Sequence, residues 1–275
     1  MGWPVARKKK AKGKASDAEA KRESLLALIE ELGLTTLAQH WGTLVARANE
    51  VAPSYTDFTC GILQIEAEAR QKRRRDRGLK RSRLGPCQDL ESFDFSLRPK
   101  LEARVVKGLL DCVWAHERRP LILVGRPGTG KTRISKTLGA AAIDEGHSVL
   151  YVKHTADMIQ DLRGARVDGS YKRTFRRYAK PDVLILDEWG YQDFDVKATD
   201  DLFRLVSERH EKASTVIVAN TGFGSWSRFF PSKAHAVATV DRLVDRATIL
   251  RFTGESVRTP KDVHGEELGD EGEAA

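Results

Sequence analysis

Residues 125–132 read Gly-Arg-Pro-Gly-Thr-Gly-Lys-Thr, which fits the phosphate-binding pattern G-x-x-x-x-G-K-[ST]. Glycines have no Cβ, so successive backbone N–H groups can converge on an anion, and the helix expected to follow adds its positive end. In this pattern Lys131 reaches the β- and γ-phosphates, and the Thr132 hydroxyl coordinates Mg²⁺. The candidate ligands of ATP are Gly125, Arg126, Pro127, Gly128, Thr129, Gly130, Lys131, Thr132 and Arg133.

An acidic pair, Asp187-Glu188, follows the apolar run Val183-Leu184-Ile185-Leu186. A carboxylate that leaves a buried strand is poorly placed unless it binds something, because desolvating an unpaired charge is expensive. We expect Asp187 to hold Mg²⁺ and Glu188 to polarise an attacking water, as acidic residues do in phosphoryl transfer. Asn220 follows the apolar run Val216 to Ala219 and is suited to orienting that water or the γ-phosphate.

The elements that must position these residues alternate between strand and helix beyond residue 100. Short continuous apolar runs predict strands at 121–124, 149–152, 183–186, 216–219 and 247–252, with helices at 132–144, 155–163 and 199–211. This pattern predicts the α/β class, with a parallel five-stranded sheet flanked by helices. A complete strand–helix unit separates the glycine-rich loop from the acidic pair, which is typical of P-loop ATPases with an inserted strand. The glutamate next to Asp187 favours hydrolysis over phosphoryl transfer to a small acceptor.

The first third of the chain shows helical periodicity and no strand signal. From these changes in pattern we expect a basic disordered arm at 1–22, a small all-α domain at 23–85 that binds DNA or a partner, and a linker at 86–100. The ATPase domain then covers 101–258, and an acidic disordered tail covers 259–275.

Positive charge gathers at the end of the helical part. The chain of 275 residues has a formal net charge of +8. Cationic clusters of this kind can present one face to the phosphates of double-stranded DNA. The candidate contacts are Arg70, Lys72, Arg73, Arg74, Arg75, Arg77, Lys80 and Arg81. A second contact is expected at Lys172 and Arg173.

The remaining composition excludes several classes. Hydrophobic residues are 40% and charged residues 31%, and no apolar run approaches the ~20 residues of a membrane helix. The cysteines Cys60, Cys87 and Cys112 have neither disulfide-framework nor zinc-ligand spacing. We expect a cytoplasmic protein with reduced thiols and no membrane contact.

Taken together and in order, these motifs resemble the IstB-like ATPases, which help an IstA-type transposase and are related to the DnaC helicase loaders. The resemblance covers residues 23–258 and rests on the segments Glu91 to Phe95, Gly125 to Thr132, Val183 to Tyr191, Asn220, Phe223 to Trp226, Asp241 to Leu243 and Arg251 to Ser256. It implies an AAA+ core with little or no lid, in which Asn220 is the first sensor. It further implies a homo-oligomer that assembles on DNA with ATP and recruits the transposase to its target.

The chain departs from the family pattern at several positions. Arg133 begins a different sequence after the P-loop, Trp189 replaces leucine, Thr221-Gly222 replaces Arg-Pro, and Lys212-Ala213 stands where arginines are common. An arginine that reaches the γ-phosphate of a neighbouring subunit must therefore lie elsewhere. Arg242 and Arg209 are the candidates, and Arg242 is equally suited to an ion pair with Asp241 or Asp245.

Three functions fit this sequence. The first is a DNA-dependent ATPase that serves transposition. The second is a loader of a replicative helicase, which would not need the cationic residues 70–83. The third is a nucleotide-gated DNA-binding scaffold in which hydrolysis is incidental. The presence of Lys131, Asp187 and Glu188 argues against this third function.

Overall fold

The computed structural model describes residues 11–191, 193–231, 233–254 and 256, in two compact units that meet at Arg74 and Arg75. The boundary lies inside a helix and precedes the domain boundary predicted at residue 85. The acidic tail at 259–275 and the first ten residues of the basic arm lie outside the described residues.

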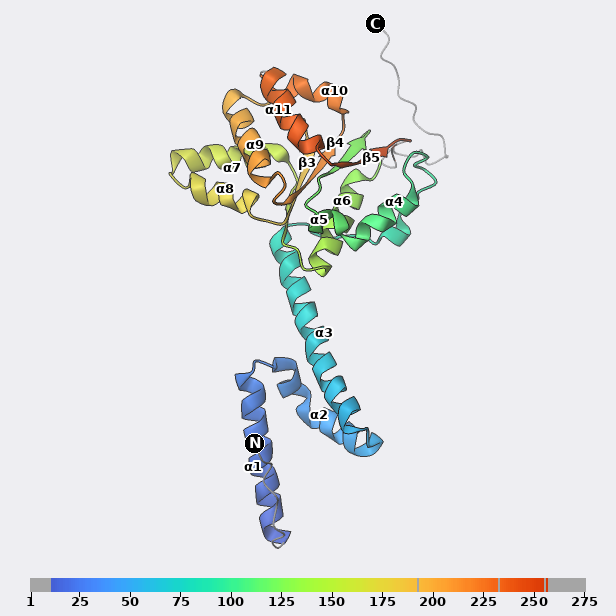
Figure 1. Ribbon diagram of the computed structural model, residues 1–275, viewed down its shortest axis with the longest axis vertical. Coiled ribbons are helices and arrows are strands. Elements are labelled where there is room, and N and C mark those ends of the chain that lie inside the picture. Colours follow the sequence, from blue (N-terminus) through green and yellow to red (C-terminus); the bar gives the residue numbers. More distant parts are fainter. Residues whose placement is uncertain (1–10, 192, 232, 255, 257–275) are drawn as a thin grey trace, which may run out of the picture. The chain divides into compact units, whose positions relative to one another are not determined.

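The first unit consists of α-helices. Helix α1 spans Ala11–Glu31, α2 spans Thr35–Val51, and α3, which continues into the second unit, spans Tyr55–Ser82 (Figure 1). Residues 11–22, predicted to be disordered, belong to α1, because their alanines and lysines have high helix propensity. The Ser54 hydroxyl accepts from the backbone N–H of Asp57 at 3.1 Å and caps α3.

The second unit is built on the predicted parallel five-stranded sheet, in the order β2-β3-β4-β1-β5. The strands are β1 (Leu121–Gly125), β2 (Val149–Val152), β3 (Val183–Trp189), β4 (Ser214–Ala219) and β5 (Thr248–Phe252). Strand β4 lies between β1 and β3, which confirms the inserted strand. The chain thus has the fold class that the apolar runs predict.

Helices cover both faces of this sheet, because alternate strand residues point to opposite faces. Leu121 and Leu123 pack with helix α6 (Lys131–Asp144), and Ile122 packs on the opposite face. The remaining helices are α4 (Ala103–Gly108), α5 (Val113–His116), α7 (Thr155–Val167), α8 (Tyr171–Ala179), α9 (Val196–Arg209), α10 (Phe223–Trp226) and α11 (Lys233–Val244). Short 3₁₀ helices lie at η1 (Leu90–Ser92), η2 (Leu109–Asp111) and η3 (Ser227–Phe229).

Candidate nucleotide site

The glycine-rich loop connects β1 to α6, as its sequence context predicts. Gly130 has a φ of +94°, which favours glycine, and it precedes the first residue of α6. A Cβ on Gly125 would lie 2.0 Å from the Phe252 carbonyl oxygen, so only glycine fits there. The buried Lys131 donates from Nζ to the carbonyl oxygens of Gly125 and Arg126, both at 2.7 Å. The lysine is therefore held directly over the loop that is expected to bind phosphate.

The strand register brings the acidic pair to the same edge of the sheet. Val124 in β1 is level with Ala219 in β4, and Ala219 is level with Trp189 in β3. Neighbouring strands are ~4.8 Å apart, so the ends of β1 and β3 are separated by about 10 Å. Asn220, which is exposed, follows β4 between them. The P-loop, the acidic pair and the predicted sensor thus meet at one edge.

The acidic pair lies at an irregularity of β3, where the register with β4 shifts between Leu186 and Trp189. Glu188 has a φ of +52°, an uncommon conformation for a residue with a Cβ. The preceding residue, Asp187, is 4% exposed. One Asp187 carboxylate oxygen accepts from the backbone N–H of Glu188 at 2.8 Å. The bend separates the two carboxylates, so that Asp187 is buried and Glu188 is half-exposed.

Strand β2 and the start of α7 supply groups that support the acidic pair. The Tyr151 hydroxyl donates to Oδ2 of Asp187 at 2.9 Å, and the Thr155 hydroxyl donates to its carbonyl oxygen at 2.9 Å. Burial, and then the charge of Asp187, raise the pKa of Tyr151, so the phenol stays protonated and donates. Nδ1 of His154 contacts Oε2 of Glu188.

Tyr151 and His154 are site residues that the sequence motifs did not predict. A usable signal was present for His154, since a polar side chain soon after a buried strand is the same pattern that singled out Asn220. Tyr151 offered no such signal, because an aromatic residue inside a strand is usually part of the core. In the structure both residues hold the acidic pair in place.

The donor set suits a hydrated Mg²⁺ ion. Magnesium prefers oxygen ligands, keeps several waters, and is usually held by one or two carboxylates together with substrate phosphates. Asp187 offers a nearly buried carboxylate at the sheet edge, and Thr132 offers a half-buried hydroxyl in the first turn of α6. The residues present therefore fit Mg²⁺–ATP, with Thr132 and Asp187 as the protein ligands.

Arg133, predicted to bind the nucleotide, is engaged elsewhere. Its Nη2 atom donates to the Asp89 carbonyl oxygen at 2.8 Å and to the Ser92 hydroxyl at 2.5 Å. Its guanidinium also lies 5.4 Å from the ring centre of Phe93. Arg133 supports a segment beside the loop, a role that the P-loop pattern does not contain.

Arg209, one of the two candidates for a trans-acting arginine, is a core residue. Its side chain is 2% exposed and donates to the carbonyl oxygens of Tyr178, Ala179, Pro181 and Ser214 and to the Thr215 hydroxyl. Burial lowers the pKa of Arg209 to about 9, which still leaves the guanidinium charged at neutral pH. That candidate is wrong, because an arginine enclosed by its own chain cannot reach a neighbouring subunit.

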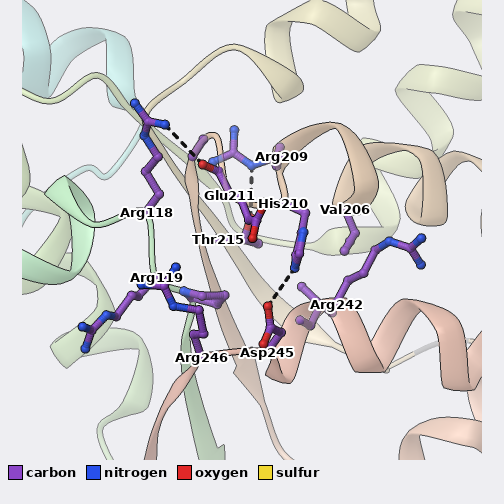
Figure 2. A pocket seen from close by; sticks show the side chains of 13 residues that line it. Arg118, Arg119, Val206, Arg209, His210, Glu211, Thr215, Arg242, Asp245 and Arg246 are labelled. Atoms are coloured by element: carbon purple, nitrogen blue, oxygen red, sulfur yellow. Dashed lines mark hydrogen bonds and ion pairs between the residues drawn. The ribbon is translucent and has the colours of Figure 1, made fainter.

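Arg242 lines a pocket with Arg118, Arg119 and Arg246 near the amino-terminal ends of β1 and β4 (Figure 2). It donates to the Ala238 carbonyl oxygen at 3.1 Å, and its guanidinium lies 4.7 Å from the Phe203 ring centre. Asp245, a predicted partner, contacts His210 at 3.1 Å instead. Arg242 lies at the edge opposite its own P-loop, so a role in hydrolysis requires the ATP of a second copy.

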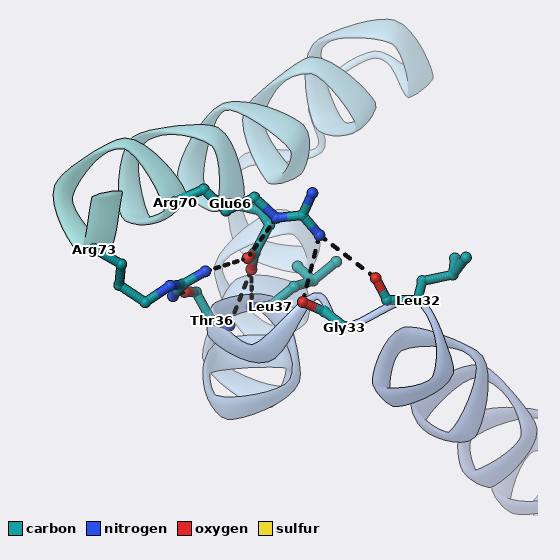
Figure 3. Close-up of polar contacts among 7 residues, drawn as sticks. All are labelled: Leu32, Gly33, Thr36, Leu37, Glu66, Arg70 and Arg73. Carbon is teal, nitrogen blue, oxygen red and sulfur yellow. Dashed lines mark hydrogen bonds and ion pairs between the residues drawn. The ribbon is translucent and has the colours of Figure 1, made fainter. Parts of the chain in front are cut away.

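Two cations of the predicted DNA-binding set are tied to a buried carboxylate in the first unit. Arg73 donates to Oε1 of Glu66 at 2.7 Å, and Nε of Arg70 lies 3.4 Å from the same oxygen (Figure 3). The other Glu66 oxygen accepts from the backbone N–H groups of Thr36 and Leu37 at 2.9 and 3.1 Å. Arg70 and Arg73 therefore stabilise the start of α2.

The other predicted cations of α3 are all exposed, and Arg75 among them is paired within the second unit. Arg75 pairs with Asp144 at 2.5 Å. The remaining members of the set are exposed: Lys72, Arg74, Arg77, Lys80 and Arg81. Lys172 and Arg173 are exposed at the start of α8, with Arg176 on the same helix. Whether these exposed side chains contact phosphate is tested below by salt dependence.

We predict that Glu66→Ala lowers the free energy of unfolding of the first unit by about 2–3 kcal/mol, because it leaves buried donors without acceptors. Burial by itself raises the pKa of Glu66. The contacts with Arg73 and with the N–H groups of Leu37 and Thr36 lower it by more, so the net pKa is below its ordinary value. The stabilisation is complete above the ordinary glutamate pKa and is lost as pH falls through the lowered one.

Hydrogen exchange of α2 measures this change, with Glu68→Ala as the control. Glu68 is exposed, lies on the same helix and accepts only a contact from Gln64 among the bonds described for it. Equal exchange in the two variants would contradict the role assigned to Glu66.

Among the residues that the structure describes, no helix is both long enough and apolar enough to cross a bilayer.

The profile of a family described as IstB-like ATP binding protein matches residues 27–264. A protein of insertion sequence IS21 from Pseudomonas aeruginosa, named for ATP binding, is 34% identical over 234 residues, which are 85% of this chain and 88% of that protein. One from IS5376 of Geobacillus stearothermophilus is 29% identical, with 86% and 94% covered.

Solved structures share the fold. The crystal structure of DnaI matches with a TM-score of 0.52 and 18% identity, covering 62% of this chain and 92% of that one. AMPPCP-bound DnaA from Aquifex aeolicus matches with a TM-score of 0.51 and 21% identity, covering 62% and 51%. At these identities the likeness extends to the fold alone.

Proposed function

Because the chain belongs to the IstB-like ATP-binding protein family, we propose that it is a DNA-dependent ATPase that assists a transposase of the IstA type. The observation that carries the proposal is the strand register, which brings Lys131, Asp187, Glu188 and Asn220 to one edge of the sheet. A P-loop without an acidic partner would support nucleotide binding only. The half-exposed Glu188 adds the group that hydrolysis requires.

Each residue of this edge has a distinct role. The backbone of residues 125–131 and the Lys131 ammonium bind the phosphates, while Thr132 and Asp187 hold Mg²⁺. When bound, the metal neutralises charge that develops on the transferred phosphoryl group. Glu188 orients a water and accepts its proton, and Asn220 orients the water or the γ-phosphate from the neighbouring strand.

Turnover is proposed to depend on a homo-oligomer assembled on DNA. Arg242 lies at the opposite edge of the sheet from the P-loop, so head-to-tail contact between copies would bring it to a neighbour's ATP. Arginines that act in this way in other systems raise the rate by roughly 10³–10⁵. ATP binding would then favour assembly, and hydrolysis would release the DNA.

For the cations of α3 we predict a measurable effect on salt dependence. Each phosphate contact contributes about −0.9 to the slope of log affinity against log salt. The triple variant Arg77→Gln, Lys80→Gln and Arg81→Gln removes exposed charges, so its slope for duplex DNA should be flatter by roughly 2–3. Fluorescence anisotropy at several salt concentrations measures the slope.

The double variant Lys172→Gln and Arg173→Gln tests the second contact in the same way and should flatten the slope by about 2. Glu68→Gln, which removes an exposed charge of opposite sign from α3, controls for general effects of net charge. A triple variant with the wild-type slope would show that these cations of α3 do not contact phosphates.

The proposed function as a whole is tested by ATPase rate and particle size, each measured with and without duplex DNA and with ATP or a non-hydrolysable analogue. We expect large particles with DNA and the analogue, and hydrolysis that rises when DNA is added. A protein that stays monomeric and hydrolyses ATP at one rate in all conditions would refute the proposal.

A further inference from the structure

Residues 75–98 run along helix α6 in the opposite direction, from its last turn to the loop at its start. Every contact lies within the second unit of the chain. Going along the segment, the contacting pairs are Arg75 with Asp144, Gly78 with Ile143, Leu84 with Gly139, Cys87 with Lys136, Gln88 with Thr137, Asp89 with Arg133, Phe93 with Gly130, and Arg98 with Thr129. The segment thus joins the cationic end of α3 to the P-loop.

The end of this segment is packed tightly on the loop. A Cβ on Gly130 would lie 2.5 Å from the Phe93 ring, so the ring fills the space beside the loop. Arg98 is 3% exposed, and its Nε donates to the Thr129 carbonyl oxygen at 2.8 Å. A loop that adjusts its backbone around phosphates must therefore move against Phe93 and Arg98.

The Arg133 side chain connects the start of α6 to residues 89–93 of this segment. From the first turn of α6 its guanidinium reaches the Asp89 carbonyl oxygen, the Ser92 hydroxyl and the Phe93 ring. Lysine could not reproduce this arrangement, because it lacks the planar fork that makes several directed contacts at once. The residue follows directly after Lys131 and Thr132, so it moves with the groups that bind the phosphates.

On the premise of the proposed function, we propose that Arg133 is a positioning residue that locks residues 84–98 onto the P-loop. When phosphates bind in the P-loop, this lock makes residues 84–98 more ordered as well. These residues follow the cationic end of α3, where DNA is expected to bind.

Hydrogen exchange of the full-length protein, with and without a non-hydrolysable ATP analogue and Mg²⁺, tests the coupling. In the wild type the analogue should slow exchange at 125–132 and also at 84–98. Arg133→Ala should keep the protection at 125–132 and lose most of it at 84–98. Arg133→Lys should retain part of it, and Arg104→Ala, which removes an exposed arginine of α4, should behave as the wild type.

The outcomes separate this inference from the proposed function. Protection at 125–132 without any change at 84–98 in the wild type would overturn the coupling and leave the nucleotide site intact. Equal protection at 84–98 in the wild type and in both Arg133 variants would also overturn the role of Arg133 and leave the nucleotide site intact. Absence of protection at 125–132 in the wild type would overturn both. If Arg133→Ala does not fold, the comparison of Arg133→Lys with the wild type decides.

Discussion

Glu188→Gln is expected to bind ATP and DNA but to hydrolyse ATP about 10²–10⁴-fold more slowly, the range that general-base catalysis contributes. Glutamine keeps the size and polarity of the side chain but cannot accept the proton of an attacking water. The phosphates and the metal are held by other residues, Lys131, Thr132 and Asp187, so affinity for ATP should change little.

Phosphate release and equilibrium binding of a fluorescent ATP analogue measure the two effects separately. Glu208→Gln, an exposed glutamate at the end of α9, is the matched control and should keep wild-type turnover. A Glu188→Gln protein that hydrolyses ATP at the wild-type rate would remove Glu188 from the reaction.

Lys131→Ala is expected to abolish ATP binding at ordinary concentrations. Removing one partner of a buried, hydrogen-bonded charge contact costs about 2–5 kcal/mol, and each 1.4 kcal/mol is tenfold in affinity. Lys131 is 4% exposed and lies over the carbonyl oxygens of the loop, so no water can replace its ammonium fully.

Isothermal titration with ATP and Mg²⁺ measures this loss. Lys136→Ala is the matched control, because it also removes a lysine of α6. The Nζ atom of Lys136 lies 5.0 Å from the Tyr151 ring centre and not over the loop. Unchanged affinity in Lys131→Ala would refute the assignment of the P-loop.

The sheet and the P-loop edge could be predicted from the sequence because both depend on local patterns. Continuous apolar runs such as Val183 to Leu186 are typical of strands that are buried on both faces. In a parallel sheet all such strands end at one edge, so the residues that follow them meet there. Asp187, Glu188 and Asn220 were found in this way without knowledge of the strand order.

The contacts around that edge could not be predicted, because they depend on side-chain direction and on distant segments. Arg209 is a candidate for a trans-acting arginine by sequence, but carbonyl oxygens of the end of α8, of Pro181 and of the start of β4 enclose it. Arg133 fits the P-loop pattern as a nucleotide ligand, but it binds residues that lie 41 and 44 positions earlier in the chain. Periodicity carries no information about such partners.

The same limit applies to charge. The stretch from Arg70 to Arg81 reads as one cationic surface. In the structure Glu66 engages Arg70 and Arg73, and Asp144 engages Arg75. Three members of this cationic run therefore pair with carboxylates of their own chain, which the run of like charges in the sequence does not show.

The central claim is that the P-loop and Asp187 share one Mg²⁺–ATP, and the affinity for ATP with and without Mg²⁺ tests it most directly. In the wild type Mg²⁺ should tighten ATP binding, and Asp187→Asn should remove that increment while leaving the affinity without Mg²⁺ near the wild-type value. An increment of the same size in Asp187→Asn would contradict the shared site.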